Sequence, residues 1–243
     1  MLDHPILARM VRKMETRAKL DDSDREALHA LRFQERVYEA GAYLVREGEL
    51  REHCALILEG FAYRQKHTID GARQIVSFHV AGDFVDLEGA LLRRADHSLQ
   101  MLTRCRIAEI PVATISALVE AHPRVGKALW VDTLIDASIF REWIMNVGRR
   151  PARQRLAHLY CELAKRLKLA GLGDESGYRM PITQDQLADA TGLTPVHVNR
   201  SLKALEIDGL IIRQGRLVVI PDWDLLRECS DFSELYLHLD QTA

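Results

Sequence analysis

One stretch decides the fold: residues 181–205 read PITQDQLADATGLTPVHVNRSLKAL. Thr183 is a good N-cap for a helix over 184–191, and Gly192 favours the left-handed backbone that ends such a helix. Thr194 caps a second helix, with Pro195 in its first turn, where the missing N–H is not needed. Two short helices joined by so tight a turn predict a helix-turn-helix.

Apolar residues at helical spacing give the two helices a shared core, and Ala188 is small where they must approach closely. The expected core residues are Leu187, Leu193, Val198, Leu202 and Leu205. Residues 210–212 and 217–220 are apolar and flank Arg213-Gln214-Gly215-Arg216, which predicts a two-stranded wing. An ordinary helical hairpin with solvated charges is the alternative, but it leaves the caps and the wing unexplained.

The outer face of the second helix carries side chains that suit DNA, because the second helix of such a motif enters the major groove. There Arg can bond bidentately to guanine, Asn can do so to adenine, and Val can touch a thymine methyl. Lys203 and the hydroxyls of Thr183 and Thr194 suit phosphates. The candidate DNA-binding residues are Thr183, Gln184, Thr194, Val196, His197, Asn199, Arg200, Lys203, Arg213 and Arg216.

Glycine divides residues 35–111 into short apolar or alternating runs. Strands are expected over 37–45, 55–58, 61–65, 74–80 and 99–110. Asp70-Gly71 predicts a hairpin turn, and a helix over 22–31 with Ser23 as its N-cap precedes the strands. Short strands with turns at this spacing predict a small antiparallel β-roll.

A long helix is expected over 124–147, which holds no proline and no glycine after Gly126. Its apolar residues cover more than one stripe, so a single domain face cannot bury them all. The simplest second partner is the same helix in another subunit, with a central helix of one monomeric core as the alternative. The expected dimer-helix residues are Leu129, Val131, Leu134, Ile135, Ile139 and Trp143.

The boundary after the long helix is expected at Asn146–Pro151, because Gly148 can end one helix and Pro151 suits the start of the next. The sequence therefore predicts an α+β protein in three parts. These are a β-roll domain over 1–123, a dimerisation helix over 124–148 and a winged helix-turn-helix domain over 149–243.

The composition limits which classes of binding partner the protein can have. The 243 residues are 47% hydrophobic and 28% charged with a formal net charge of −2, so DNA binding must rest on a local motif. No apolar run approaches the roughly 20 residues of a membrane helix, and a secretory signal is not expected. The four cysteines form no CxxC pair, which favours reduced thiols in a cytoplasmic protein with no membrane partner.

Together these segments resemble the Crp/Fnr family of bacterial transcription regulators over about residues 20–225. The matching roll segments are 40–48 (AGAYLVREG), 56–60 (LILEG) and 82–85 (GDFV), and residues 182–205 are the more specific match. The resemblance implies a cyclic-nucleotide-binding-like sensor roll, a homodimer on an inverted-repeat DNA site, and RNA polymerase as a partner. It implies a regulator and not an enzyme. Val196 stands where many relatives carry Glu, whereas Arg200 keeps the family's arginine position.

The chain departs from the family at the effector site. Cyclic-AMP-binding members carry Arg-Ser where this chain has His97-Ser98, and a neutral imidazole cannot replace a bidentate guanidinium. The resemblance therefore implies an unknown effector other than cyclic AMP. The candidate effector-pocket residues are Gly82, Asp83, Phe84, Asp86, Glu88, His97 and Ser98. The oxygen-sensing branch uses N-terminal cysteines for an iron–sulfur cluster, and because none precedes Cys54, no cluster is expected.

Two alternatives stay open. A regulator of the same type can work without any small-molecule effector. A cupin-like metalloenzyme would need converging His and carboxylate ligands, but the roll has no HxH or HxxxE pairing and this alternative ignores the wing. His79, His97, Cys54 and Cys105 are possible haem or metal ligands, yet none sits at a recognised spacing, so no metal site is expected.

Overall fold

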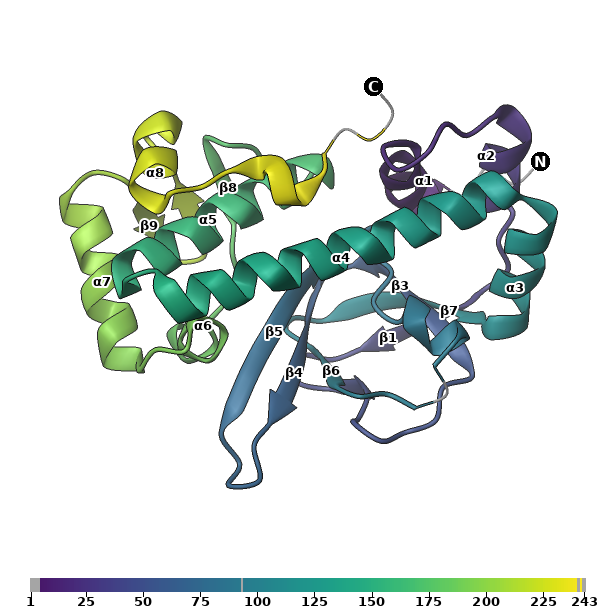
Figure 1. Cartoon of the computed structure of the whole chain (residues 1–243), viewed down its shortest axis with the longest axis horizontal. Coiled ribbons are helices and arrows are strands. Elements are labelled where there is room, and N and C mark those ends of the chain that lie inside the picture. The colour runs from purple at the N-terminus through teal and green to yellow at the C-terminus, as the bar shows by residue number, and fades with distance from the viewer. Residues whose placement is uncertain (1–4, 93, 240, 242–243) are drawn as a thin grey trace. The chain divides into compact units, whose positions relative to one another are not determined.

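The computed structural model describes residues 5–92, 94–239 and 241. The chain divides into two compact units, the first built from the residues up to Lys66 with Phe78–Ser138 and Leu237 onward, the second from His67–Ser77 and Ile139–Tyr236. The helix α4 (Pro123–Arg149) is continuous and contributes to both units (Figure 1). No helix in the described part of the chain is long and apolar enough to cross a membrane.

Two antiparallel sheets form the β-roll that the sequence predicts. One sheet holds β1 (Gln34–Tyr38), β7 (Cys105–Pro111) and β3 (His53–Glu59), in that order. The other holds β2 (Tyr43–Val45), β6 (Ser98–Met101), β4 (Phe61–His67) and β5 (Arg73–Val80). A short 3-10 helix, η2 (Leu87–Ala90), lies between β5 and β6.

Short helices complete the first unit: η1 (Pro5–Leu7), α1 (Ala8–Glu15), α2 (Asp22–His29) and α3 (Val112–Ala121). One hydrophobic cluster joins these helices and the start of α4 to strands β3 and β7. Its buried members include Met10, Met14, Leu28, Leu56, Ile110, Ile115, Val125 and Leu129. The amphipathic helix α1, for which no element is predicted above, is therefore part of the roll's core.

Two predicted strands are wrong as single elements, because turns divide them. The run over 37–45 breaks at Gly41, which has a φ of +84° and donates its N–H to the Met101 carbonyl over 2.8 Å. The run over 99–110 breaks at residues 102–104, where the N–H groups of Leu102 and Thr103 both donate to the Phe61 carbonyl. Apolar periodicity continues through both turns, so the pattern alone does not reveal the breaks.

The predicted cap of α2 is also wrong. Asp21, and not Ser23, is the N-cap, because its carboxylate accepts the N–H of Asp24 over 2.9 Å. The Asp24 carboxylate in turn accepts the N–H of Asp21, which completes a reciprocal capping box. The helix ends at His29, two residues before the predicted end.

The second unit is a winged helix-turn-helix assembled on the helix α5 (Ala152–Leu169). Its other helices are α6 (Gln184–Thr191), α7 (Pro195–Ile207), α8 (Trp223–Ser230) and the short η3 (Glu234–Leu237). Its three-stranded sheet has the order β8 (Gly177–Arg179), β10 (Leu217–Val219), β9 (Ile212–Gln214). Glu162 is fully buried in α5, where it accepts hydrogen bonds from Trp143 Nε1 and Tyr236 Oη, each over 2.9 Å.

The helix α4 has two apolar sides, as its sequence predicts. Of the six expected dimer-helix residues, Leu129, Ile135, Ile139 and Trp143 are buried within their own chain, Val131 is half-buried and Leu134 is exposed. The opposite side carries Trp130, Leu134 and Ile144, which are 68%, 54% and 73% exposed. Within the described residues this side of α4 stays exposed, and of the six predicted residues Leu134 lies on it.

Candidate nucleic-acid interface

Local hydrogen bonds fix both ends of α6, the first helix of the motif. The Thr183 hydroxyl oxygen accepts the N–H of Gln186 over 3.2 Å, and the Gln186 side chain accepts the N–H of Thr183 over 2.9 Å. At the other end Gly192 has a φ of +63°, and a Cβ there would lie 3.0 Å from Val147 Cγ1. The predicted bounds of this helix, its N-cap and its glycine end are confirmed.

The second helix, α7, begins as predicted with Thr194 as its cap and Pro195 in its first turn. The Thr194 hydroxyl oxygen accepts the N–H of His197 over 3.3 Å. The apolar residues expected in the core are buried except Leu193, which is half-buried: Leu187, Val198, Leu202 and Leu205. Because this core fixes the rotation of α7, the opposite face of the helix is directed to solvent.

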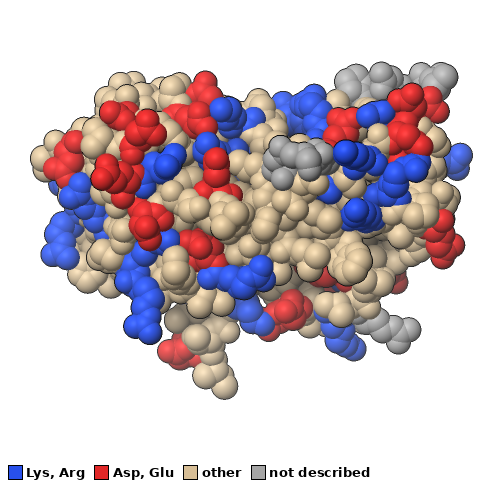
Figure 2. All heavy atoms as spheres, turned by 45° about the horizontal axis from the view of Figure 1, so that its top comes forward, with Lys and Arg blue, Asp and Glu red and all other residues tan. Residues whose placement is uncertain are grey.

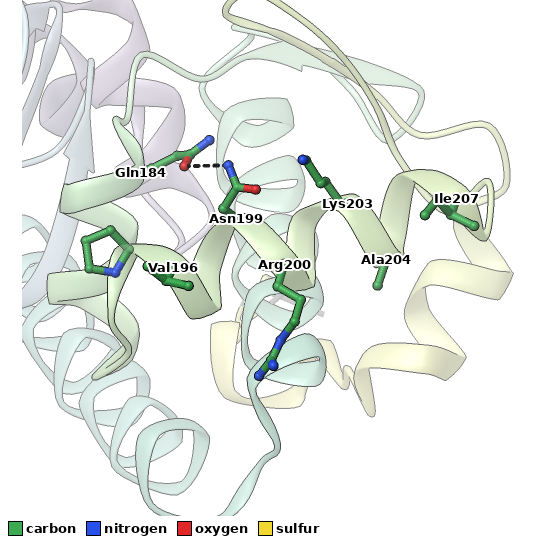
Figure 3. Close-up of a pocket in the computed structure, with 8 residues that line it drawn as sticks. Gln184, Val196, Asn199, Arg200, Lys203, Ala204 and Ile207 are labelled. Carbon is green, nitrogen blue, oxygen red and sulfur yellow. Dashed lines mark hydrogen bonds between the residues drawn. The ribbon is translucent and has the colours of Figure 1, made fainter.

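That outward face lines a shallow hollow (Figure 3). The lining residues are Gln184, Pro195, Val196, Asn199, Arg200, Lys203, Ala204 and Ile207. Arg200 and Lys203 are exposed, and no ion pair engages either of them among the residues that the structure describes. Val196 and Ile207, which are 76% and 84% exposed, give this hollow apolar side chains beside its polar ones. The remaining candidate on α7, His197, is also exposed.

The wing places its two candidate arginines differently. Arg213 is half-buried and its Nε and Nη2 atoms lie 2.9 and 3.0 Å from the two carboxylate oxygens of Glu206. Hydrogen bonds from Arg213 lower the pKa of Glu206, so this pair is charged at neutral pH. Arg216 is exposed in the turn between β9 and β10. Arg213 therefore braces the wing against α7, and Arg216 is the exposed cation.

Charge is mixed on the face of the molecule that Figure 2 displays. Figure 2 shows acidic and basic side chains interspersed across the face in view, in keeping with the net charge of −2. Such a surface gives no general attraction for the DNA backbone. Any attraction for nucleic-acid phosphates would have to come from local cations, and Arg200, Lys203 and Arg216 are the exposed ones among the candidate residues.

The candidate effector-pocket residues lie in residues 82–98 of the roll and are all buried or half-buried. Gly82 has a φ of +96° in a turn, Phe84 is buried, and the Ser98 hydroxyl accepts the N–H of Glu47 over 3.0 Å. The three carboxylates pair with cations of the same chain: Asp83 with Lys13 at 2.9 Å, Asp86 with Arg51, and Glu88 with Arg64 at 3.3 Å.

Sequence reasoning missed these three cations. They come from α1, from the segment before β3 and from β4, all distant in sequence from the carboxylates they neutralise. Arg64 is 6% exposed and also bonds Asp136 of α4 over 3.0 Å. His97 lies at the edge of the same network, with Nδ1 2.7 Å from Asp96 and Nε2 3.5 Å from Glu88. The sequence signal for such cations is the crowding of Asp83, Asp86 and Glu88 in a buried segment, because buried carboxylates need partners of opposite charge.

The possible metal ligands are dispersed. No group of three or more His, Cys, Asp or Glu side chains is arranged to hold a metal ion in residues 5–92, 94–239 and 241. Burial raises the pKa of the Cys54 thiol to about 11, and it also raises the pKa of Cys105. Both are therefore thiols at neutral pH, as is usual for buried structural cysteines.

His79 makes the stability of the roll depend on pH. Burial and the nearby Arg64 guanidinium lower the pKa of His79 to about 4, from about 6.5 in an unfolded chain. The contribution of neutral His79 is complete above pH 6.5 and is lost as the pH falls towards 4, by up to about 3 kcal/mol, because only the unfolded chain takes up the proton. We expect urea titrations from pH 7 to 4 to show this extra loss in the wild type relative to His79→Gln. A difference between the two proteins that does not change with pH would contradict the assignment.

Comparisons with known proteins agree with this architecture. Two family models match, a cyclic nucleotide-binding domain over residues 35–122 and a Crp-like helix-turn-helix domain over residues 154–229. The transcriptional activator protein FnrL of Cereibacter sphaeroides is 30% identical over 223 residues, which cover 89% of this chain and 88% of that protein. The nitrogen fixation regulation protein FixK of Azorhizobium caulinodans is 24% identical over 226 residues, or 92% of this chain and 90% of that protein.

Among solved structures, FixK2 from Bradyrhizobium japonicum matches with a TM-score of 0.76 and 22% identity, over 84% of this chain and 100% of that one. The matches account for both the roll and the winged helix, which the cupin-like alternative does not. The exposed face of α7 lies in the matched Crp-like helix-turn-helix domain. The chain belongs to the Crp/Fnr family of transcription regulators.

Proposed function

We propose that the protein regulates transcription as a homodimer that binds an inverted-repeat DNA site through two copies of α7. The observation that carries this proposal is the combination of a reading face fixed by caps and core on α7 with an uncovered apolar side on α4. Two reading heads related by a two-fold axis recognise half-sites about one helical turn (~34 Å) apart.

The dimer proposal rests on the spacing along α4. The exposed or half-buried residues Trp130, Leu134, Ala137, Arg141, Ile144 and Gly148 follow one another in alternating steps of four and three. This is the seven-residue period of a helix that packs along another helix. A second copy presents the same stripe, which makes a self-complementary two-fold contact. Only Leu134 is shared with the six residues expected from the sequence, since four of the others are buried within their own chain.

The role of each exposed side chain at the DNA follows from its chemistry. Arg200 suits the O6 and N7 acceptors of guanine, and Val196 suits a thymine methyl where a Glu would read cytosine. Lys203 and Arg216 are exposed cations for phosphates. The capping hydroxyls of Thr183 and Thr194 each keep an O–H that can donate to a phosphate.

We further propose an effector other than cyclic AMP, or none. Support comes from the roll, where the buried cation nearest to His97 in the same ion-pair network, Arg64, is already neutralised by Glu88 and Asp136 and is not available to a phosphate. His97 supplies no second guanidinium. The protein is proposed to act in the cytoplasm, at promoters, through contacts with RNA polymerase and without catalytic activity of its own.

Selection from a pool of duplexes with a randomised core tests the function. The full-length protein is incubated with the pool, bound DNA is recovered and amplified, and the enriched sequences are read. We expect an inverted repeat whose half-site centres lie about 10–10.5 bp apart or a multiple of this spacing. Enrichment of a single unrepeated motif, or of no motif, would contradict the proposed function.

A further inference from the structure

A hydrogen bond between two amide side chains joins the two helices of the motif. Asn199 Nδ2 donates to Gln184 Oε1 over 3.2 Å, from the middle of α7 to the first residue of α6. Both side chains are half-buried and both line the hollow that holds Val196 and Arg200. Figure 3 shows the Asn199 side-chain oxygen directed away from Gln184. The contact therefore uses the nitrogen of the Asn199 amide. Its oxygen remains available to a base in the DNA major groove.

The two N–H groups of a primary amide are not equivalent. One lies on the same side as the carbonyl oxygen, and the other lies on the side of the Cβ carbon. Adenine presents N7 as an acceptor and N6–H as a donor in the major groove. An asparagine reads both at once with its oxygen and the N–H beside that oxygen. The bond to Gln184 takes the other N–H, so it does not compete with an adenine.

Gln184 also restricts the rotation of the Asn199 amide, and this rotation would reduce specificity for one base. The amide torsion of asparagine has a broad, nearly two-fold energy profile. An amide without a hydrogen-bond partner therefore exchanges the positions of its oxygen and nitrogen readily. With the oxygen of Gln184 facing it, an Asn199 amide that turned alone would set oxygen against oxygen, so reversal requires both amides to turn together. A bond that orders the reading group before the DNA arrives lowers the entropy cost of recognition.

We propose that Gln184 is a positioning residue that holds the Asn199 amide in the orientation that reads an adenine in each half-site. The inference rests on the proposed function, since it assumes that α7 reads base edges. It assigns to Gln184 an effect on one base pair, whereas a side chain near a helix N-terminus that contacts only phosphate affects all sequences alike.

The test compares base preferences among the wild type, Asn199→Ala, Gln184→Ala and Gln184→Glu. Dissociation constants are measured on the duplex selected by the wild type and on duplexes with each base pair of the half-site changed in turn. We expect Asn199→Ala to remove most of the preference for one A·T pair, a change of about 5- to 150-fold. Gln184→Ala should reduce the preference at that same pair by about 3- to 10-fold, and adding it to Asn199→Ala should reduce it no further.

Gln184→Glu separates positioning from a direct contact. A carboxylate can only accept, so it still holds Asn199 Nδ2 and should keep the adenine preference. Its negative charge should weaken binding to every duplex by a similar factor. Loss of the adenine preference in Gln184→Glu, or a loss in Gln184→Ala that is equal for all base pairs, would overturn the inference while the selected inverted repeat still stood. If the wild type selects no site at all, the proposed function fails first and the inference fails with it.

Discussion

The double variant Leu134→Glu/Ile144→Glu is expected to sediment as a monomer at concentrations where we expect the wild type to sediment as a dimer. Both side chains lie on the uncovered side of α4, and in a two-fold dimer the change puts four carboxylates into a seam where Arg141 supplies one cation per chain, so that at least two carboxylates stay unpaired. Each buried, unpaired charge costs several kcal/mol. We therefore expect the dimerisation constant to weaken by more than about 1,000-fold.

DNA binding should fall with the dimer, although neither substitution touches α7. A dimer binds its second half-site as an intramolecular step, and this advantage is commonly about 100- to 10,000-fold. Ile69→Glu is the control for an added carboxylate, because Ile69 is fully exposed in the turn between β4 and β5 and receives one such charge away from α4. The control should stay a dimer with full affinity. A double variant that folds as shown by circular dichroism and is still a dimer would contradict the α4 interface.

Arg200→Ala is expected to lose specific binding with little change on random DNA. A bidentate contact with guanine contributes about 1–3 kcal/mol of discrimination, which is roughly 5- to 150-fold in the dissociation constant for each half-site contact. Arg200 is exposed on the outward face of α7, and its loss leaves the core formed by Val198, Leu202 and Leu205 unchanged. Competition binding against the selected inverted repeat and a scrambled duplex measures both affinities.

Lys203→Ala provides the comparison on the same helix. Lys203 is also exposed, and if it binds a phosphate its removal should weaken binding to both duplexes alike. The salt slope should fall by about 1 for each phosphate that is no longer neutralised. If Arg200→Ala behaves like Lys203→Ala, then Arg200 contacts only the DNA backbone and the proposed guanine contact is wrong.

The helix-turn-helix is predictable from sequence because its signals are local. Thr183, Gly192, Thr194 and Pro195 each act within one helical turn, and the structure places α6 at the predicted bounds. The strands of the roll are less predictable, because Gly41 interrupts an apolar run without changing its pattern. The register of a strand depends on its neighbours in the sheet, and no local signal fixes it.

Predictions from sequence are limited at the proposed dimer and DNA-binding sites for the same reason. The sequence shows that α4 has two apolar sides, but periodicity alone cannot tell which side its own domain buries, so Leu129 and Trp130 are not distinguished. Likewise, Arg213 is a wing arginine by sequence, yet a carboxylate seven residues earlier holds it. The bond between Gln184 and Asn199 depends on how two helices pack, so only the structure reveals it.

Native mass spectrometry of the full-length protein with the selected duplex tests the central claim most directly, because it counts the chains bound to one DNA site. We expect two chains per duplex on the inverted repeat. Under the same conditions, the complex with a duplex that carries a single half-site should be far weaker. One chain per inverted repeat, bound as tightly as to the single half-site, would contradict the account of a homodimer that reads its site through two copies of α7.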